Sequence, residues 1–505
     1  MSETKPATEK SIFLPSIILA AILAVGFVFF SEATSGFANA AMSWITTYFG
    51  WLYLLSGIGA IIFCLWISLG RFAHVKLGDA DEKPEFSGLH WVAMMFTAGI
   101  GAGLVTWAFV EPIYYLQTPP FGIEPHSSAA FEWAHMYPVF HWGLIPWAFY
   151  ALPTVPIAYS LYVKKDKFLR VSAACDQALP HSGKNGAKTL IDIFIILGLL
   201  GGTATSLGLG VPLVSALTAE LFGIADNQLV KFSVLGLWVL LFGASTLRGL
   251  KKGIQVLADI NMVLAGVVLV FIFIAGPTLF ILNMSVNSIG LMLDNMIRMS
   301  FWSDPIEKTG FVQDWTVFYW AWWLAYATLM GLFVGRISRG RTIKQVIMGT
   351  LLWGSLGTSL FLLVAGGYAL DLQLNNIHDL SATLTTQGMS AVTADAVASL
   401  PLGKLVLTVF IILCLIFYAT TMDSAAFVLA GVCSKDLPSH QDPQLSLRIS
   451  WILIVGLFTA GMLISGNLNT VKSLTVISSL PLIPILTIMC VSLIKELKLS
   501  HGDNN

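Results

Sequence analysis

The sequence has few of the charged residues that cover soluble proteins, and too few cysteines for a disulfide framework. Asp, Glu, Lys and Arg make up 11% of the 505 residues, roughly half the usual share of a soluble domain. Their charges sum to −1, which excludes a basic surface for nucleic acid. The five cysteines show no paired spacing, so we expect small buried side chains rather than disulfides or metal ligands.

Motifs for ATP hydrolysis and for enzyme chemistry are also missing. No glycine-rich loop is followed by Lys-Ser or Lys-Thr, which disfavours an ATP-driven pump. His141 has no second ligand at metal spacing, and no nucleophile is arranged with a base. We therefore expect no enzymatic activity and no organic cofactor.

Long apolar runs are abundant, since 56% of the chain is hydrophobic. Runs of about 20 residues can each cross roughly 30 Å of hydrocarbon, so the sequence predicts an all-α membrane protein. Twelve transmembrane helices are expected at 12–31, 51–70, 89–118, 138–162, 189–218, 231–248, 255–284, 314–335, 345–371, 404–432, 447–466 and 472–494.

The basic residues predict the orientation of these spans. All but five of the 27 lysines and arginines lie in one set of loops, which by the positive-inside rule faces the cytoplasm. The opposite set holds Lys231, Arg298, Lys308, Lys404 and Lys472. Both termini are then cytoplasmic, in agreement with an even number of spans.

Two stretches are irregular for a membrane helix. Gly99, Gly101 and Gly103 lie inside the third span, where close packing of helices or an interrupted helix that lines a cavity would each explain them. Thr420 and Thr421 lie beside Asp423 in the middle of the tenth span. Hydroxyls and carbonyls suit an alkali cation, although a hydrogen-bonded helix contact explains this cluster equally well.

An aromatic stripe runs through the eighth span. Trp315, Tyr319, Trp322 and Tyr326 are spaced four, three and four residues apart, so they share one face of a regular helix. The stripe extends too deep for an interfacial belt. Electron-rich rings attract cations that cannot donate hydrogen bonds, such as trimethylammonium groups. Without a buried acid, such a face also suits a zwitterion.

A second aromatic group follows His141. Pro146 can kink this helix and turn Trp142 and Trp147 toward a common cavity, with Tyr114 as a further wall. Core packing is the simpler explanation for any one of these rings, but not for the ensemble.

These segments resemble the betaine/choline/carnitine transporter family over essentially the whole chain. The resemblance rests on 314–323 (DWTVFYWAWW), 335–341 (GRISRGR), 140–142 (FHW) with Pro146 and Trp147, and 249–253 (GLKKG). It implies two inverted five-helix repeats, as in leucine-transporter-like carriers, after two peripheral helices. The implied parts are the N-terminus and peripheral helices (1–88), the first repeat (89–284), a surface amphipathic helix and loop (285–313, with the helix at 288–302), the second repeat (314–494) and a short tail (495–505).

The resemblance also implies functional residues, a homotrimer and a location in the bacterial inner membrane. The substrate cage maps onto Tyr114, Trp142, Trp322, Trp323 and Tyr326, with Trp147 and Tyr150 close by, Met330 one turn on and Trp315 as an outer contact. A sodium site maps onto Thr97, Ile100, Phe417, Thr420 and Thr421, and a second one onto Thr203, Thr205 and Ser206.

Two branches of the family compete. The carnitine/γ-butyrobetaine antiporter needs no coupling ion, because an arginine near the sodium site supplies the charge, and it resembles this chain at Tyr326 and Met330. Asn261 stands at that arginine position here, which favours a cation-coupled symporter. Gly103 replaces the acid of choline-specific members and favours a carboxylate-bearing substrate. The short tail predicts little osmotic regulation.

Overall fold

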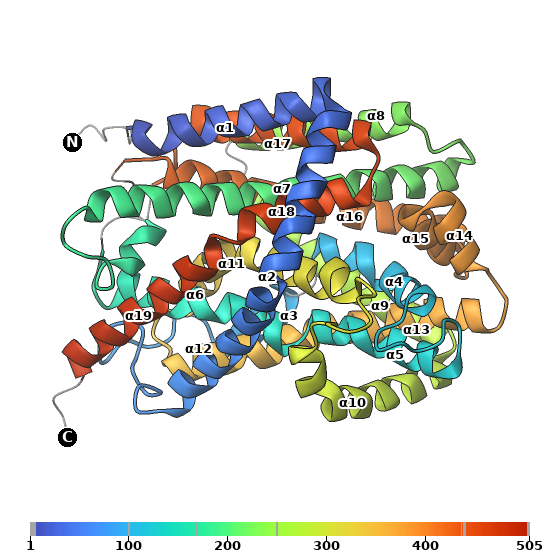
Figure 1. Ribbon diagram of the computed structural model, residues 1–505, viewed down its shortest axis with the longest axis horizontal. Helices are drawn as coiled ribbons and strands as arrows, with labels where there is room; N and C mark the ends of the chain where they lie inside the picture. The colour runs from blue at the N-terminus through green and yellow to red at the C-terminus, as the bar shows by residue number, and fades with distance from the viewer. Residues whose placement is uncertain are drawn as a thin grey trace.

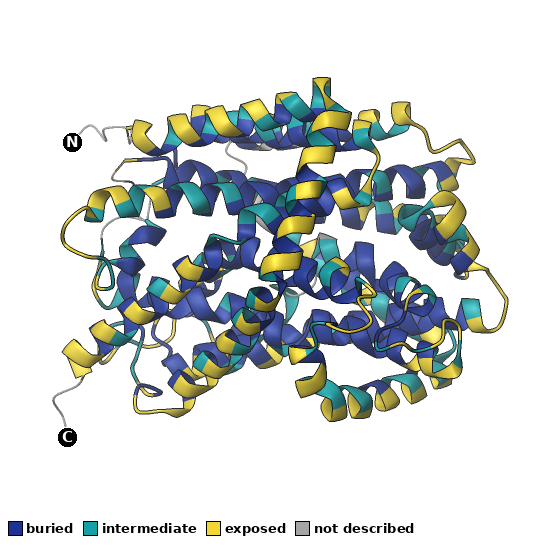
Figure 2. Ribbon diagram, in the orientation of Figure 1, coloured by how far each residue is buried: buried dark blue, intermediate teal, exposed yellow. Residues whose placement is uncertain are grey.

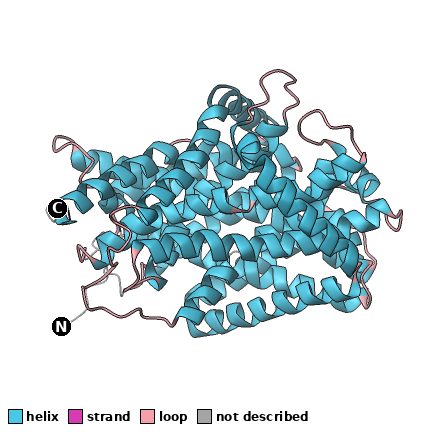
Figure 3. Ribbon diagram, turned by 90° about the horizontal axis from the view of Figure 1, so that it is seen from below, coloured by secondary structure: helices cyan, strands magenta, loops and turns pink. Residues whose placement is uncertain are grey.

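The computed structural model is a bundle of α-helices (Figures 1 and 3). It describes residues 7–98, 101–166, 170–248, 251–435, 437 and 441–501, with side chains in those ranges except at 102, 244–245, 247–248 and 251–257. Within these ranges the chain forms no β-strand, only two isolated bridges. The predicted all-α class is confirmed.

The first half of the bundle contains two peripheral helices and five spans, two of which are divided. Its elements are α1 (Lys10–Phe29), α2 (Ser31–Leu69), α3 (Gly88–Ala98), α4 (Ala102–Gln117), α5 (Ser128–His141), α6 (Leu144–Tyr162), the short η1 (Val171–Cys175), α7 (Lys184–Phe222), α8 (Gln228–Arg248), α9 (Lys251–Ala275) and α10 (Thr278–Phe301).

The second half begins with a π-helical turn that continues into a long α-helix. Its elements are η2 (Val312–Val317), α11 (Phe318–Ile337), α12 (Ile343–Gly349), the π-helical η3 (Thr350–Gly354), α13 (Ser355–Leu374), α14 (Leu380–Gln387), α15 (Met389–Ala398), α16 (Gly403–Val432), α17 (Leu445–Ser465), α18 (Leu468–Ser479) and α19 (Leu482–His501).

Among the described residues, eleven helices are long and apolar enough to cross a membrane, and α3 with α4 makes a twelfth if the bent pair is one span. This set includes α10, which we expected at 288–302 along the membrane surface and which begins at Thr278. It leaves out α8, whose apolar part is shorter. The protein is therefore a multi-pass membrane protein, and the surface position of α10 stays a prediction.

The helices pack as two related sets of five spans. The first set is α3–α4, α5–α6, α7, α8 and α9, and the second is η2–α11, α12–α13, α16, α17 and α18–α19. Equivalent helices make equivalent contacts: α4 packs on α13 as α11 packs on α6, and α7 packs on α18 as α16 packs on α9. Because five spans separate the equivalents, they cross the membrane in opposite directions, as expected for an inverted repeat.

Burial follows this arrangement (Figure 2). The middle of α7 is enclosed by α11, α16 and α18, and its side chains are buried over several turns. Large apolar side chains such as Ile22, Phe37, Ile62, Val263 and Leu279 are instead more than half exposed on α1, α2, α9 and α10. A soluble protein does not expose so much apolar surface, so these faces contact lipid.

All five cysteines are buried and unpaired, as the sequence predicted. The two ends of the described chain lie at the same end of the molecule (Figure 1). Lys472 differs from expectation: it does not lie in an outer loop but is buried in α18, because that helix begins at Leu468, one turn before it.

Candidate functional site

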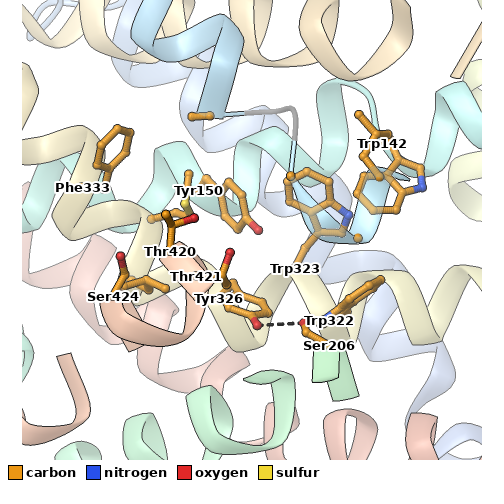
Figure 4. Close-up of a pocket in the computed structure, with 16 residues that line it drawn as sticks. Trp142, Tyr150, Ser206, Trp322, Trp323, Tyr326, Phe333, Thr420, Thr421 and Ser424 are labelled. Atoms are coloured by element: carbon orange, nitrogen blue, oxygen red, sulfur yellow. Dashed lines mark hydrogen bonds between the residues drawn. The ribbon is translucent and has the colours of Figure 1, made fainter. Parts of the chain in front are cut away.

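A cavity of about 300 Å³ lies between α4, α6, α7, α11 and α16 (Figure 4). Its size is at the lower end of the range for small-molecule sites in proteins. The described residues that line it are Ala98, Gly101, Gly103, Leu104, Trp142, Tyr150, Ser206, Trp322, Trp323, Tyr326, Leu329, Met330, Phe333, Thr420, Thr421 and Ser424. None of these side chains is acidic or basic.

The interrupted third span forms one wall of the cavity. α3 ends at Ala98 and α4 begins at Ala102, and their axes differ by 53°. A Cβ atom at Gly103 would lie 3.0 Å from the Trp322 ring and 3.3 Å from the Trp142 ring. Glycine at this position therefore lets two indoles close against the backbone of α4, so the stretch both interrupts the helix and allows close packing.

A second break brings Trp142 to the cavity. α5 ends at His141, and α6 begins at Leu144 after Trp142 and Gly143. A Cβ atom at Gly143 would lie 2.5 Å from the Val139 carbonyl oxygen, so the turn needs glycine. Pro146 lies in the first turn of α6, where proline is tolerated, and does not kink the chain. Trp147 consequently does not line the cavity but is fully buried behind it, 5.6 Å from the Trp323 ring.

Helix α11 supplies the other rings. Trp322 and Trp323 cross Trp142 edge to face, with ring centroids 6.0 Å and 5.6 Å from it. Tyr150 lies 4.5 Å from Trp323. The hydroxyl of Tyr326 is 2.8 Å from that of Ser206 on α7 (Figure 4). These rings together with Met330 enclose the space that the sequence predicted for a substrate.

Tyr114 and Trp315, two of the predicted contacts, lie outside this cavity. They belong to a ring cluster with Trp107, in which Trp315 is 4.9 Å from Tyr114 and 5.7 Å from Trp107. Trp315 is part of the π-helical turn η2, whereas Trp322 and Tyr326 belong to α11. In a regular α-helix Trp315 would share a face with Trp322 and Tyr326, but the π-helical turn moves it off the face that lines the cavity.

A buried acid holds the cage in place, a role that no sequence pattern indicated. Glu111 on α4 is fully buried and is bonded on both carboxylate oxygens. Trp142 Nε1 and Tyr319 Oη donate to Oε2 over 3.0 Å and 2.7 Å, and Tyr115 Oη donates to Oε1 over 2.6 Å. His141 Nδ1 lies 3.3 Å from Oε1. The carboxylate thus fixes the indole of Trp142 from outside the cavity.

Only part of the predicted cation site lines the cavity. Thr420 and Thr421 face it from α16, and the described residues offer the Thr421 hydroxyl no hydrogen-bond partner. The Thr420 hydroxyl bonds to the carbonyl of Phe417 over 3.0 Å, and that of Thr97 bonds back to Ala93 within α3. Ile100 lies outside the described residues. The cation site remains a prediction.

The three residues of the second predicted sodium site do not all face the same neighbour, and that site stays a prediction. Thr205 faces α18, where its hydroxyl donates to the Val471 carbonyl over 2.8 Å. Ser206 faces Tyr326 instead, and the Thr203 hydroxyl bonds to the Leu199 carbonyl within α7. Thr203 and Ser206 thus share the face of α7 that is turned toward Tyr326, whereas Thr205 points away from them toward α18.

Asp423 is separated from the two threonines. Its carboxylate accepts hydrogen bonds from Arg448 over 2.7 Å and from Thr246 over 3.3 Å. The cluster of polar residues in the tenth span is therefore divided: the threonines face the cavity and the acid forms an ion pair with α17. No group of three or more His, Cys, Asp or Glu side chains in the described chain could hold a metal ion.

A family model with the description "BCCT, betaine/carnitine/choline family transporter" matches residues 11–502. The chain belongs to the BCCT family. BCCT proteins are secondary transporters for substrates of the betaine, carnitine and choline type, and not enzymes, so this chain is a membrane-integral transporter of a small molecule.

Among solved structures, the BCCT chain is similar to a Na⁺-coupled sialic acid symporter in a substrate-bound outward-open state. The two share 12% sequence identity with a TM-score of 0.43, over 81% of this chain and 79% of the other. At that level the likeness indicates neither the substrate nor the ion of this transporter.

The cavity of this BCCT transporter continues toward one end of the bundle. A second cavity of about 350 Å³ shares Leu329, Phe333 and Ser424 with the first and extends to Arg336 and Arg448. That end carries most of the lysines and arginines of the loops. At the opposite end, the cluster of Trp107, Tyr114 and Trp315 packs between the cavity and the surface. The structure is therefore open toward the basic side.

Proposed function

We propose that this BCCT transporter imports a quaternary-ammonium zwitterion of the carnitine or glycine betaine type by cation-coupled symport, with sodium as the coupling ion. The observation that carries the proposal is the cavity wall, where Trp142, Trp322, Trp323, Tyr150 and Tyr326 converge without a charged neighbour among the described lining residues. A trimethylammonium group has no N–H to donate, so ring faces are its best partners.

The energetics of this wall are sufficient for a cationic group. Each ring contributes about 0.5–2 kcal/mol, depending on how far the site is desolvated. Several rings together stabilise the ammonium group without a buried carboxylate, and Glu111, which lies behind the cage, is already bonded by four groups. An unpaired acid in the wall would instead repel the carboxylate of a zwitterion.

The opposite side of the cavity suits the other end of such a substrate. Thr420, Thr421 and Ser424 present hydroxyls across from the indoles of Trp142 and Trp322 (Figure 4). Hydroxyls donate to a carboxylate, and they are also hard oxygen ligands for an alkali cation. The position of Met330 beside Tyr326 leaves a polarizable thioether against the substrate's methyl groups.

Sodium is proposed because Thr420 and Thr421 face the cavity and none of the described residues that line it carries a positive charge. Asn261, at the position where the antiporter branch has an arginine, is buried and donates to the Leu413 carbonyl over 3.2 Å. A neutral amide cannot supply the positive charge that coupling needs. We also propose a homotrimer in the bacterial inner membrane with both termini in the cytoplasm, so that the open end of the cavity faces inward.

Transport then proceeds by alternating access. The substrate and the cation bind from outside, order α3 and α4 against α16, and the bundle moves to the inward-open arrangement. If the two are coupled, each must tighten the binding of the other by the same factor.

The experiment is uptake of labelled L-carnitine and glycine betaine into liposomes that contain the purified protein. Sodium-driven accumulation into empty vesicles is the expected result. Uptake that ignores sodium and needs vesicles preloaded with substrate would contradict symport and establish an exchanger. Uptake driven by a proton gradient would show that protons, not sodium, are the coupling ion. Uptake of a sulfonium analogue alone would show that the substrate is not a quaternary-ammonium compound.

A further inference from the structure

The first half of the interrupted third span, α3, is attached to the rest of the bundle along one narrow face. All eleven of its residues are described, and two of them, Trp91 and Met95, are buried. These two lie four residues apart and therefore on the same side of the helix. Because the span is interrupted after Ala98, α4 does not fix the direction of α3, which depends on the contacts of this face.

The buried face of α3 rests on α12 and η3. The indole Nε1 of Trp91 donates to the Ser338 hydroxyl over 3.0 Å. The Trp91 ring lies so close to Gly349 that a Cβ atom at that position would overlap it. One turn further along α3, the sulfur of Met95 lies 3.9 Å from the Thr350 hydroxyl. The partners of this face thus lie between the end of α11 and the end of η3.

Arg341 completes the attachment at the start of α3. Its guanidinium carbon is 4.3 Å from the centroid of the Trp91 ring, within the range of cation–π attraction. Its Nη2 donates to the carbonyl oxygens of Phe86 and Ser87, over 2.9 Å and 3.4 Å. The residue is buried, and no carboxylate of the described chain lies within ion-pair distance of it. The carbonyls and the ring, and not an acid, therefore compensate for its burial.

The backbone around Arg341 is paired with the loop that leads into α3. The Leu77 N–H donates to the Arg341 carbonyl, and the Gly340 N–H donates to the Leu77 carbonyl, each over 2.8 Å. The Ile343 N–H donates to the Val75 carbonyl over 2.9 Å. The loop before α3 and the loop between α11 and α12 are thus joined by backbone hydrogen bonds as well as by the arginine.

We propose that Arg341 is a positioning residue that holds α3 on α12, so that the two helices move as one body when the cavity changes the side to which it opens. Ala98, the last residue of α3, lines the cavity. If α3 turned away from α12 on its own, it would open this wall without moving the other helices. The role rests on the proposed alternating-access cycle, but not on which substrate or ion is carried.

The test is the distance between spin labels on Leu89→Cys in α3 and Lys344→Cys in α12, in the full chain in lipid nanodiscs. Both positions are exposed, whereas the five native cysteines are buried, so the labels attach to the introduced cysteines. With Arg341 present we expect one narrow distribution that sodium and betaine do not change. Arg341→Met removes the donors and the charge and should broaden it or add a longer distance. Arg341→Lys, which keeps a cation beside Trp91, should largely restore it.

Two further variants separate this role from a general loss of folding. Gly349→Ala displaces the Trp91 ring without altering Arg341, so it should broaden the same distribution, and it serves alone if Arg341→Met does not fold. Arg339→Met is the matched control, because Arg339 lies in the same loop but pairs with Glu82 instead of α3. Its distribution should stay narrow. A narrow distribution in both Arg341→Met and Gly349→Ala would overturn the proposal.

Transport kinetics in liposomes give a second measurement. Arg341 is not among the described residues that line either cavity, so Arg341→Met should leave KM for the preferred betaine within ~2-fold. The value of kcat should fall ~10-fold or more, because α3 no longer follows the movement of the other helices. An unchanged kcat would contradict the role of Arg341. Absence of betaine uptake by the unaltered protein would overturn the proposed function, whereas the label distances would still decide whether Arg341 holds α3.

Discussion

Replacement of Glu111 tests whether the cage is held in place from behind. Glu111→Met keeps the length of the side chain but removes both acceptor oxygens. The Trp142 N–H and the Tyr319 O–H, which both donate to Oε2, then lose their acceptor in a fully buried place. An unsatisfied buried donor costs about 1–3 kcal/mol.

The loss of the hydrogen bond to Trp142 should weaken substrate binding. If the indole gives up its orientation to find another acceptor, the cage loses one wall, and we expect Kd for the preferred betaine to rise ~5- to 150-fold. Thermal stability should fall as well. Tryptophan fluorescence titration gives Kd, and a melting curve in detergent gives stability, so the two effects are measured separately.

Two comparison variants test whether the effect of Glu111→Met on Kd acts through Trp142. Glu111→Gln keeps one acceptor oxygen, which should turn to Trp142 because an indole N–H can only donate. It should therefore retain most of the affinity while losing the strength of charged hydrogen bonds. In a Trp142→Phe background, Glu111→Met should change Kd little, since the group it positions is gone. Unchanged Kd in Glu111→Met, or equal losses in Glu111→Gln and Glu111→Met, would refute the positioning role.

Two further pairs of variants test the walls of the cavity. Gly103→Ala adds a methyl 3.0 Å from the Trp322 ring and should weaken binding ~10-fold or more, whereas a methyl at Gly101 meets no atom of the described residues within 4 Å, so Gly101→Ala should bind normally in the same titration. Equal effects would contradict the steric argument. Thr421→Ala should raise the sodium concentration for half-maximal uptake ~5-fold or more, and Asp423→Asn, whose acid is bound to Arg448, should not. A larger effect of Asp423→Asn than of Thr421→Ala would indicate that sodium binds at Asp423 instead.

Much of the fold and of the cage could be predicted because the physical signals are local. Apolar runs of membrane length predict helices wherever they occur, and rings three or four residues apart share a helical face. Trp322 and Tyr326 lie within the regular part of α11, so that spacing brought them correctly to one side.

Two aromatic residues that do not line the cavity, Trp315 and Trp147, lie where the backbone departs from a regular helix. The π-helical turn at Val312–Val317 moves Trp315 off the cavity, and the break at Gly143 places Pro146 in a first turn, which leaves Trp147 behind the wall. Spacing alone does not reveal either departure, because both depend on how neighbouring helices pack.

The polar contacts between residues far apart in the chain could not be predicted from the sequence either. Glu111 bonds Tyr115 one turn along its own helix, which a spacing of four could have suggested, but its bonds to Trp142 and Tyr319 join three separate spans. Lys472 looked like a loop residue because the predicted span began with it, whereas α18 starts one turn earlier.

The most direct test of the central claim is equilibrium binding of glycine betaine and L-carnitine to variants of the cage. Trp323→Ala removes a ring that lines the cavity and should weaken binding ~2- to 30-fold, and the double variant with Trp322→Ala at least ~5-fold. Trp51→Ala is the matched control, because that ring is 54% exposed on the outer face of α2 and should leave Kd unchanged. Unaltered affinity in both cage variants, with folding intact, would contradict the assignment of this cavity as the site for a quaternary-ammonium substrate.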